Sequence, residues 1–235
     1  MKGLMSLATR SSRTESRPAL SRDRVLRAAI ELADEGGIGA VTMRRLAESL
    51  GAEAMSLYHH VANKEQVLDG VVDVIATEIN EVVGRITLPT RGAAWQSAAR
   101  ERILTARRLL LRHRWAPSVF ESRTTTSPAV LLYYDGLIGI MRDGGFSNDL
   151  AHRAMHALGS RALGFSQELF TPGDGPATGE PDPVMASMAA RLPHLVGMLA
   201  EVMHDDPDST LGWCDDQAEF EFGLDLLLDG LDRRR

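Results

Sequence analysis

The chain has 235 residues, of which 44% are hydrophobic and 25% charged, so it can build a sizeable core and is not disordered as a whole. A single cysteine, Cys214, excludes an intramolecular disulfide and fits a reducing cytoplasm. The first 20 residues lack the apolar run of a signal peptide, and no later run of about 18 residues is free of charge. We therefore expect a cytoplasmic protein with no membrane partner.

The net charge of −6 is unevenly distributed along the chain. Residues 1–30 hold seven basic and two acidic side chains, so this segment carries +5 and the remainder carries −11. A local basic excess of this kind favours an anionic partner such as nucleic acid, and a solvated basic tail is the alternative interpretation.

Apolar residues recur at helical spacing almost throughout, which predicts an all-α protein. The first helix is expected to begin after Ser21 and end at Gly36, and the second to run from its N-cap Thr42 to Leu50, with Gly51 as its stop. A short third helix is expected over about 53–60.

Asn63 is expected to cap a longer helix, with Gln66 reaching back to it, and this helix continues to about residue 84. Ser127 and Ser147 are expected to be the N-caps of two later helices. The helices expected after the first long one cover 93–113, 127–143, 147–170, 183–203 and 214–232, and a loop rich in proline and glycine covers 171–183.

Residues 42–60, "TMRRLAESLGAEAMSLYHH", give helix, tight turn and helix, which is the helix-turn-helix arrangement. Ala47 is small where the second helix crosses closely, Gly51 permits the turn, and Leu46, Leu50 and Leu57 supply a buried seam. Because this spacing also occurs in helical proteins that do not bind DNA, the alternative is an all-α small-molecule-binding protein or enzyme in which the motif is only structural.

From Ser21 to Leu68, "SRDRVLRAAIELADEGGIGAVTMRRLAESLGAEAMSLYHHVANKEQVL", the chain resembles the DNA-binding domain of the TetR (tetracycline-repressor) family of transcriptional regulators. The segments "GGFSNDLAHRAMHALGSRALG" (144–164) and "FEFGLDLLLDGLDRRR" (220–235) resemble helices of the tetracycline-repressor type of C-terminal domain. The resemblance implies an all-helical homodimer with a three-helix DNA-binding head and a larger core that holds a ligand. It divides the chain into a basic arm (1–20), a helix-turn-helix domain (21–66) and a ligand-binding and dimerisation domain (67–235).

In a helix-turn-helix the start of the second helix meets base edges while flanking groups hold phosphates. Met55 and Ser56 lie near that start, Tyr58 and His60 carry donors for phosphate oxygens, and His59 can meet a base edge or a thymine methyl. A core position is the alternative for Tyr58. By resemblance, Arg44 corresponds to a position that reaches into the groove, where a bidentate contact with guanine would suit it, and Thr42 and Lys64 correspond to phosphate-contacting positions. An ordinary solvated pair with Arg45 is the alternative for Arg44.

The resemblance also places five residues at pocket positions of the tetracycline-binding members: Asn80, Phe120, Tyr134, Leu137 and Glu168. Those members chelate a magnesium–tetracycline complex through a histidine in the segment corresponding to 118–123, where either Phe120 or Glu121 stands here, and Asn80 stands where they have another histidine. A lone carboxylate does not make such a site, so we expect a different small-molecule effector, which can be largely apolar, no metal and no cofactor. His152 and His156 share a helix face, but the pattern HExxH is absent and pocket lining or plain surface is the alternative to metal binding.

These observations predict a repressor, and not an enzyme, because no nucleophile–base pair is found. The alternatives within the same class are a regulator that activates and one that responds to no small molecule. A small-molecule effector would release the repressor from a palindromic operator in double-stranded DNA. The dimer is expected to form through helices 147–170 and 214–232, with apolar faces made of Leu150, Ala154, Leu158, Phe222 and Leu226.

Overall fold

The computed structural model describes residues 19–125, 127–165, 191–202 and 216–235, and all regular structure in these ranges is helical. The chain divides into two compact units, of which the first ends at Val67 and the second begins at Leu68. This division lies one residue from the boundary predicted between 66 and 67. Most of the predicted arm (1–20), the predicted loop (171–183) and Glu168 lie outside the described residues.

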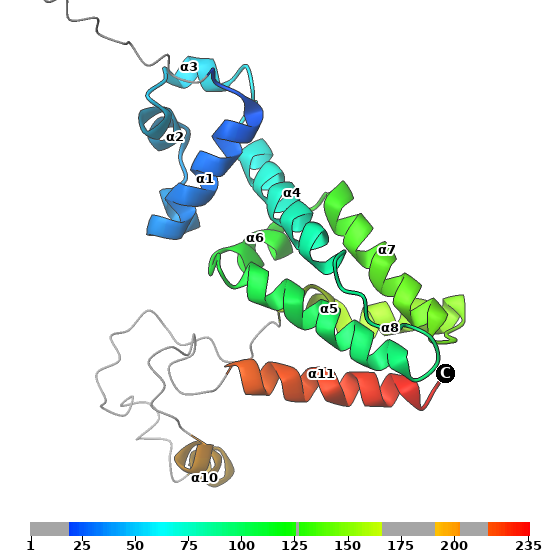
Figure 1. Ribbon diagram of the computed structural model, residues 1–235. Coiled ribbons are helices and arrows are strands. Elements are labelled where there is room, and N and C mark those ends of the chain that lie inside the picture. Colours follow the sequence, from blue (N-terminus) through cyan, green and yellow to red (C-terminus); the bar gives the residue numbers. More distant parts are fainter. Residues whose placement is uncertain (1–18, 126, 166–190, 203–215) are drawn as a thin grey trace, which may run out of the picture. The chain divides into compact units, whose positions relative to one another are not determined.

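The first unit consists of short helices that enclose a small core (Figure 1). Their bounds are α1 Arg22–Gly36, the 3₁₀ helix η1 Ile38–Ala40, α2 Met43–Leu50 and α3 Ala54–Leu57, and α4 (Lys64–Val83) begins in this unit. Val25, Leu26 and Leu32 of α1 are buried together with Leu46 of α2 and Leu57 of α3. The seam predicted from Leu46, Leu50 and Leu57 is buried in this core.

Helix starts follow the predicted capping residues closely. The side-chain oxygens of Ser21, Thr42, Ser127 and Ser147 accept hydrogen bonds of 3.1 to 3.3 Å from backbone N–H groups three residues later. Asn63 Oδ1 accepts from the Gln66 N–H at 2.9 Å. Each bond satisfies one of the N–H groups that a helix leaves without a partner at its first turn.

Two predicted helices are shorter in the structure. The helix expected over 53–60 ends at Leu57, because the N–H groups of His60 and Val61 both donate to the Leu57 carbonyl and close a turn. Tyrosine and histidine have only middling helix propensity, and this turn lets Val61 enter the core, where it is 1% exposed. The helix expected to reach residue 170 ends at Leu158, where Gly159 adopts φ +51°.

The long helices of the second unit pack side by side (Figure 1). Besides most of α4, its elements are α5 Ala94–Leu110, α6 Ala116–Ser122, α7 Pro128–Asp143, α8 Asn148–Leu158, the 3₁₀ helix η2 Gly159–Leu163, α10 Pro193–Val202 and α11 Asp216–Asp232. α5 contacts α7, α11 and η2, and α8 contacts α7 and α11. The short helix α6 was not predicted from the sequence.

One apolar cluster forms the core of the second unit. It is built on Trp95 and Ile103 of α5, Leu137 of α7, Ala154 of α8 and Leu224 of α11, all of which are fully buried. Trp95 meets the ring of Phe146 edge to face, with ring centroids 4.6 Å apart.

The burial of α8 corrects the dimer face predicted for it. Ala154 and Leu158 are 0% and 1% exposed because both point into the core of their own subunit, so they are not available to a second copy. On α11, by contrast, Phe222 is 64% and Leu226 is 58% exposed, as the prediction requires. The periodicity of α8 does give one apolar face, but the core of a single chain and the core of a dimer interface use the same residue types.

Candidate DNA-binding interface

The helix-turn-helix is formed by α2, the turn at Gly51 and α3. Gly51 adopts the left-handed conformation (φ +58°, ψ +41°), and the N–H of Ala52 donates to the Ala47 carbonyl at 2.9 Å. Ala47 is 4% exposed, which agrees with a small residue at a close helix crossing. Leu46, Leu50 and Leu57 are all buried, so the seam predicted from the sequence holds α3 against α2.

Thr42 and Arg44 are exposed at the first turn of α2. The Thr42 hydroxyl accepts from the Arg45 N–H at 3.2 Å, and its own proton remains available for a phosphate oxygen. Arg44 Nε lies 2.9 Å from Glu48 Oε1, with side chains 88% and 60% exposed. An exposed pair of this kind contributes little, about 0.2 to 1 kcal/mol, so a nucleic acid could take over the guanidinium at small cost.

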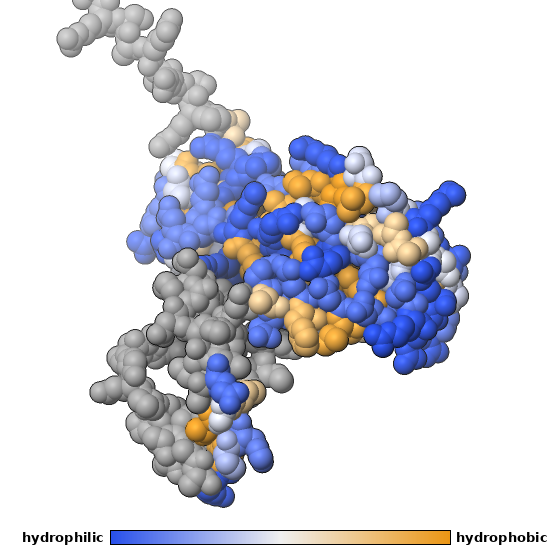
Figure 2. Space-filling view, turned by 60° about the horizontal axis from the view of Figure 1, so that its bottom comes forward, coloured by the Kyte–Doolittle hydropathy of each residue, from blue (hydrophilic) through white to orange (hydrophobic). Residues whose placement is uncertain are grey.

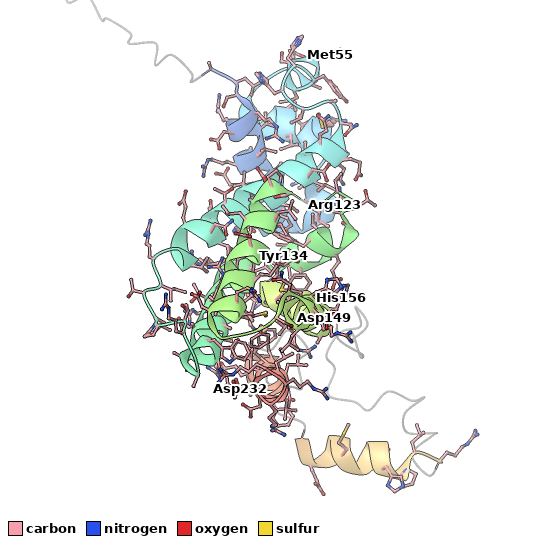
Figure 3. All side chains as sticks on the ribbon, turned by 90° about the vertical axis from the view of Figure 1, so that its right-hand side faces the viewer. Met55, Arg123, Tyr134, Asp149, His156 and Asp232 are labelled. Atoms are coloured by element: carbon pink, nitrogen blue, oxygen red, sulfur yellow. The ribbon has the colours of Figure 1, made fainter. Side chains whose placement is uncertain are left out.

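The residues around α3 differ sharply in exposure. Met55 is 74% and Tyr58 45% exposed, and His59 is exposed, whereas Leu57 between them is fully buried. Tyr58 is therefore not a core aromatic. Met55 stands at the outer end of α3, clear of the core (Figure 3). Ser56 and His60 are half-buried, so less of each side chain is accessible than in the exposed residues Met55, Tyr58 and His59.

His59 and His60 belong to the turn after α3 and not to the helix. His59 is exposed there, whereas His60 is half-buried. Lys64 is half-buried at the first position of α4, directly after the cap residue Asn63. Gln66 was predicted to reach back to Asn63. Its Oε1 instead accepts from the Ala62 N–H at 2.8 Å. The turn between α3 and α4 is thus tied on both sides of Asn63.

The exposed side chains Thr42, Arg44, Met55, Tyr58 and His59 come from one continuous motif of α2, turn and α3. Arg45, which was not among the predicted contact residues, is also exposed on α2. These side chains combine phosphate donors, a bidentate donor for guanine and an apolar tip for a thymine methyl. A compact helical unit with this surface on a helix-turn-helix is a DNA-binding protein of the helix-turn-helix class.

The four described residues of the predicted ligand set lie in the second unit on three helices. Asn80 of α4 and Phe120 of α6 are half-buried, and Asn80 Nδ2 donates to the Ala129 carbonyl at 2.8 Å. Tyr134 of α7 is half-buried near the middle of that helix (Figure 3), whereas Leu137 is fully buried in the core cluster. Burial raises the pKa of the Tyr134 hydroxyl above its ordinary value.

His152 and His156 are exposed on α8, with ring centroids 4.6 Å apart. The neighbouring carboxylate, Asp149, is paired with Arg153 at 2.8 Å. In the described ranges no three histidine, cysteine, aspartate or glutamate side chains are grouped so as to hold a metal ion. The described helices also include none that is long and apolar enough to cross a membrane.

Comparison with known families agrees with both units. Residues 25–71 match the family described as bacterial regulatory proteins, tetR family, and residues 88–235 match the tetracyclin repressor-like, C-terminal domain. The chain therefore belongs to the TetR family of transcriptional regulators, and its C-terminal part is of the tetracycline-repressor type.

Curated relatives and solved structures place the chain in the same family. The tetracycline repressor protein class D of Escherichia coli is 32% identical over 91% of this chain and 89% of its own length. An HTH-type transcriptional regulator from Saccharopolyspora erythraea is 32% identical over 64% of this chain, and that match spans 61% of the relative's length. All of these relatives are transcriptional regulators.

Among solved structures, a possible TetR family transcriptional regulator from Streptomyces coelicolor A3(2) superposes with a TM-score of 0.71. It is 29% identical, and the match covers 92% of this chain and 100% of that one. ActR, a TetR family protein from Streptomyces coelicolor in complex with (S)-DNPA, superposes with a TM-score of 0.66 at 25% identity over 92% and 98% of the two chains.

Proposed function

We propose that this TetR-family protein is a ligand-responsive repressor that binds a palindromic operator as a homodimer and releases it when a small molecule binds the second unit. The observation that carries the proposal is the set of outward side chains on the helix-turn-helix, from Thr42 and Arg44 to Met55, Tyr58 and His59. Repression is supported by the relative named as a tetracycline repressor. Such a protein works by binding alone, in the bacterial cytoplasm where the chromosome lies.

Homodimerisation is supported by the apolar face of α11. Phe222 and Leu226 are four residues apart, which is about one helical turn, and both are more than half exposed. Figure 2 turns this side of the second unit toward the viewer and shows apolar surface among hydrophilic side chains. Pairing this face with a second copy would remove both side chains from water and place two helix-turn-helix motifs about a two-fold axis.

A small-molecule effector is supported by the ligand complex of ActR, which superposes on this chain over most of its length. The described candidates for contact are Asn80, Phe120, Tyr134 and Leu137, and Glu168 completes the set predicted from the sequence. Because Phe120 and Asn80 provide no imidazole, we propose an effector other than magnesium–tetracycline.

Coupling between ligand and DNA is proposed to run through α4, which begins in the first unit and continues into the second. Three polar contacts tie the part of α4 beyond Leu68 to the α6–α7 region. Asp69 pairs with Arg123 at 3.4 Å, Asp73 accepts from the Ser127 hydroxyl at 2.8 Å, and Asn80 donates to Ala129. A ligand that shifts α6 or the start of α7 would thus bias the position of α4, which is the differential contact that allostery requires.

The experiment that tests the proposal is selection of bound sequences from random duplex DNA by the purified full-length chain. We expect a palindromic site whose half-sites are spaced by about one helical turn of DNA or a multiple of it. The selected duplex is then titrated with protein at several salt concentrations, and its affinity is compared with that of a scrambled duplex. Recovery of no enriched sequence, or equal affinity for the scrambled duplex, would overturn the proposal.

A further inference from the structure

Arg102 of α5 and Tyr133 of α7 form a polar pair inside the second unit. Arg102 Nη2 donates to the Tyr133 carbonyl at 3.0 Å, and the guanidinium carbon lies 4.7 Å from the centroid of the Tyr133 ring. Tyr133 is 0% exposed, whereas Arg102 as a residue is only half-buried, so one part of it remains open to an approaching solute. The pair thus reaches from the core toward the surface.

Both side chains carry a buried polar atom that no described residue satisfies. Arg102 Nε and the Tyr133 hydroxyl are buried and have no hydrogen-bond partner among the described residues. No described carboxylate pairs with Arg102, although Arg100 on the same helix pairs with Glu221 and Asp225. A buried guanidinium N–H group and a buried hydroxyl that lack hydrogen-bond partners are both costly, so their retention in one place needs an explanation.

The surroundings act on both groups in the direction expected for this burial. Desolvation lowers the pKa of the Arg102 guanidinium and raises the pKa of the Tyr133 hydroxyl, because each charged form loses hydration. A bound anion would offset the desolvation of the Arg102 guanidinium, because it supplies a counter-charge that no described residue provides.

Gly136 makes the room in which the guanidinium lies. A Cβ atom at this position would stand 2.9 Å from Arg102 Cζ and 3.3 Å from Nη1, closer than side-chain atoms normally approach. Any larger residue would therefore move the guanidinium, whose flexible stem allows it to leave without unfolding the helix. Because Gly136 has no side chain, the Arg102 guanidinium can lie against the Tyr133 ring.

We propose that Arg102 and Tyr133 anchor the oxyanion of an acidic small-molecule effector, which makes the effector an organic acid with an apolar body. The inference rests on the proposed function and assigns it a ligand class. The guanidinium N–H groups other than the one bonded to the Tyr133 carbonyl suit a carboxylate or phenolate in a fork, and the Tyr133 hydroxyl adds a further donor. Tyr134, half-buried with its ring 6.1 Å from that of Tyr133, offers an aromatic wall for the apolar body.

The test uses 1-hydroxy-2-naphthoate as probe and its neutral amide as matched ligand, titrated into the full-length dimer by calorimetry at neutral pH. We expect the acid to bind at least about tenfold more tightly than the amide, as a charge-assisted pair requires. Arg102→Gln should weaken binding of the acid by about tenfold or more and leave binding of the amide unchanged. Arg102→Lys should recover part of the loss, because it restores charge without the planar fork.

Two further variants separate anchoring from a merely structural role. Gly136→Ala keeps Arg102 but displaces its guanidinium. This substitution should weaken binding of the acid and leave binding of the amide unchanged. Arg108→Gln, which removes an exposed arginine of the same helix paired with Glu101, should leave both affinities unchanged. Equal binding of acid and amide by the unsubstituted protein, or unchanged binding of the acid by Arg102→Gln, would overturn the inference.

Operator binding without probe is measured on the same samples. If the protein binds its operator but does not prefer the acid, only the ligand class is wrong. If it binds no operator, the proposed function itself fails, whatever the probe does.

Discussion

The carbonyl oxygen of Gly164 accepts a 3.0 Å hydrogen bond from Nη1 of Arg107, an arginine that is only 5% exposed. The same guanidinium stands 4.2 Å over the Phe220 ring and donates from Nε to Gln217 at 2.9 Å. Arg107, a residue of α5, therefore connects that helix both to Gly164, which follows η2, and to α11. Gly164 can approach this closely because it has no side chain and adopts φ +87°.

Gly164→Ala should be strongly destabilising. Its Cβ would lie 2.6 Å from the Arg107 Cα, which is backbone and cannot move aside, and its φ would be strained. We expect a loss of about 3 kcal/mol or more in the free energy of unfolding, measured by chemical denaturation. The matched control is Gly139→Ala in α7, where the new Cβ meets nothing within 4 Å and should stabilise the helix by about 1 kcal/mol. Equal effects of the two substitutions would contradict this account of Gly164.

Substitutions on the helix-turn-helix should change operator affinity without affecting the fold. Arg44→Ala should cost about 1 to 3 kcal/mol, as expected for a lost contact with guanine, and Tyr58→Phe about 1 kcal/mol for a lost phosphate bond. Both are exposed, so thermal unfolding should not change. The measurement is a salt-dependent titration with the selected operator, and unchanged affinity in both variants would refute the assigned contacts.

Glu48→Gln gives a test in the opposite direction. Glu48 holds Arg44 at 2.9 Å and places a negative charge beside the proposed DNA surface. Its neutralisation should tighten operator binding by a few-fold, because it frees Arg44 and removes repulsion of phosphate. Arg108→Ala, an exposed arginine in the second unit, serves as control and should leave affinity unchanged. Weaker binding by Glu48→Gln would show that Glu48 positions Arg44 and does not compete with DNA.

Replacing the exposed apolar residues of α11 by charges should separate the dimer. Phe222→Glu with Leu226→Glu would place two like charges per subunit in the proposed interface, and burial of these charges is unfavourable. Sedimentation should then show monomers, and affinity for the palindromic operator should fall. Leu132→Glu on α7 is the control, because Leu132 is similarly exposed, at 61%, but lies outside the proposed interface. A dimer that persists in the double variant would exclude α11 as its main contact.

Tyr133 should make stability sensitive to alkaline pH. Burial raises the pKa of its hydroxyl in the folded state, so the unfolded chain ionises first, and stability is lost as pH rises above about 10. Tyr133→Phe should remove part of this loss and leave stability at neutral pH unchanged or slightly higher, because the hydroxyl has no described partner. Thermal unfolding of both proteins between about pH 8 and about pH 11 checks this; parallel curves would contradict it.

Tetracycline with Mg²⁺ should fail to release the operator. Phe120 and Asn80 provide no metal-binding nitrogen, and the described residues hold no three-ligand group. Release is measured by fluorescence anisotropy of labelled operator, with the class D tetracycline repressor as positive control. Release of the operator by this chain at micromolar tetracycline would show that the absence of histidine at positions 80 and 120 does not exclude that ligand.

Much of the fold was predictable because the signals are local. Ser21, Thr42 and Ser127 cap helices through bonds to N–H groups three residues away, so the sequence itself contains both partners. Gly51 required only its own backbone freedom, and the Leu46, Leu50 and Leu57 seam followed from helical spacing. Tyr58 was expected to point outward because it adjoins the buried Leu57, and it is exposed, whereas Ser56 on the other side of Leu57 is half-buried.

Tertiary structure alone decided features that join distant segments. The sequence predicted an apolar face on α8, but only packing showed that Ala154 and Leu158 serve their own subunit. The bond from Trp95 Nε1 to Asp232, across 137 positions, has no local signal, and neither has the meeting of Arg102 with Tyr133 over Gly136. Local propensity and periodicity establish which residues a helix buries, whereas the identity of the partner that buries them depends on contacts between residues far apart in the chain.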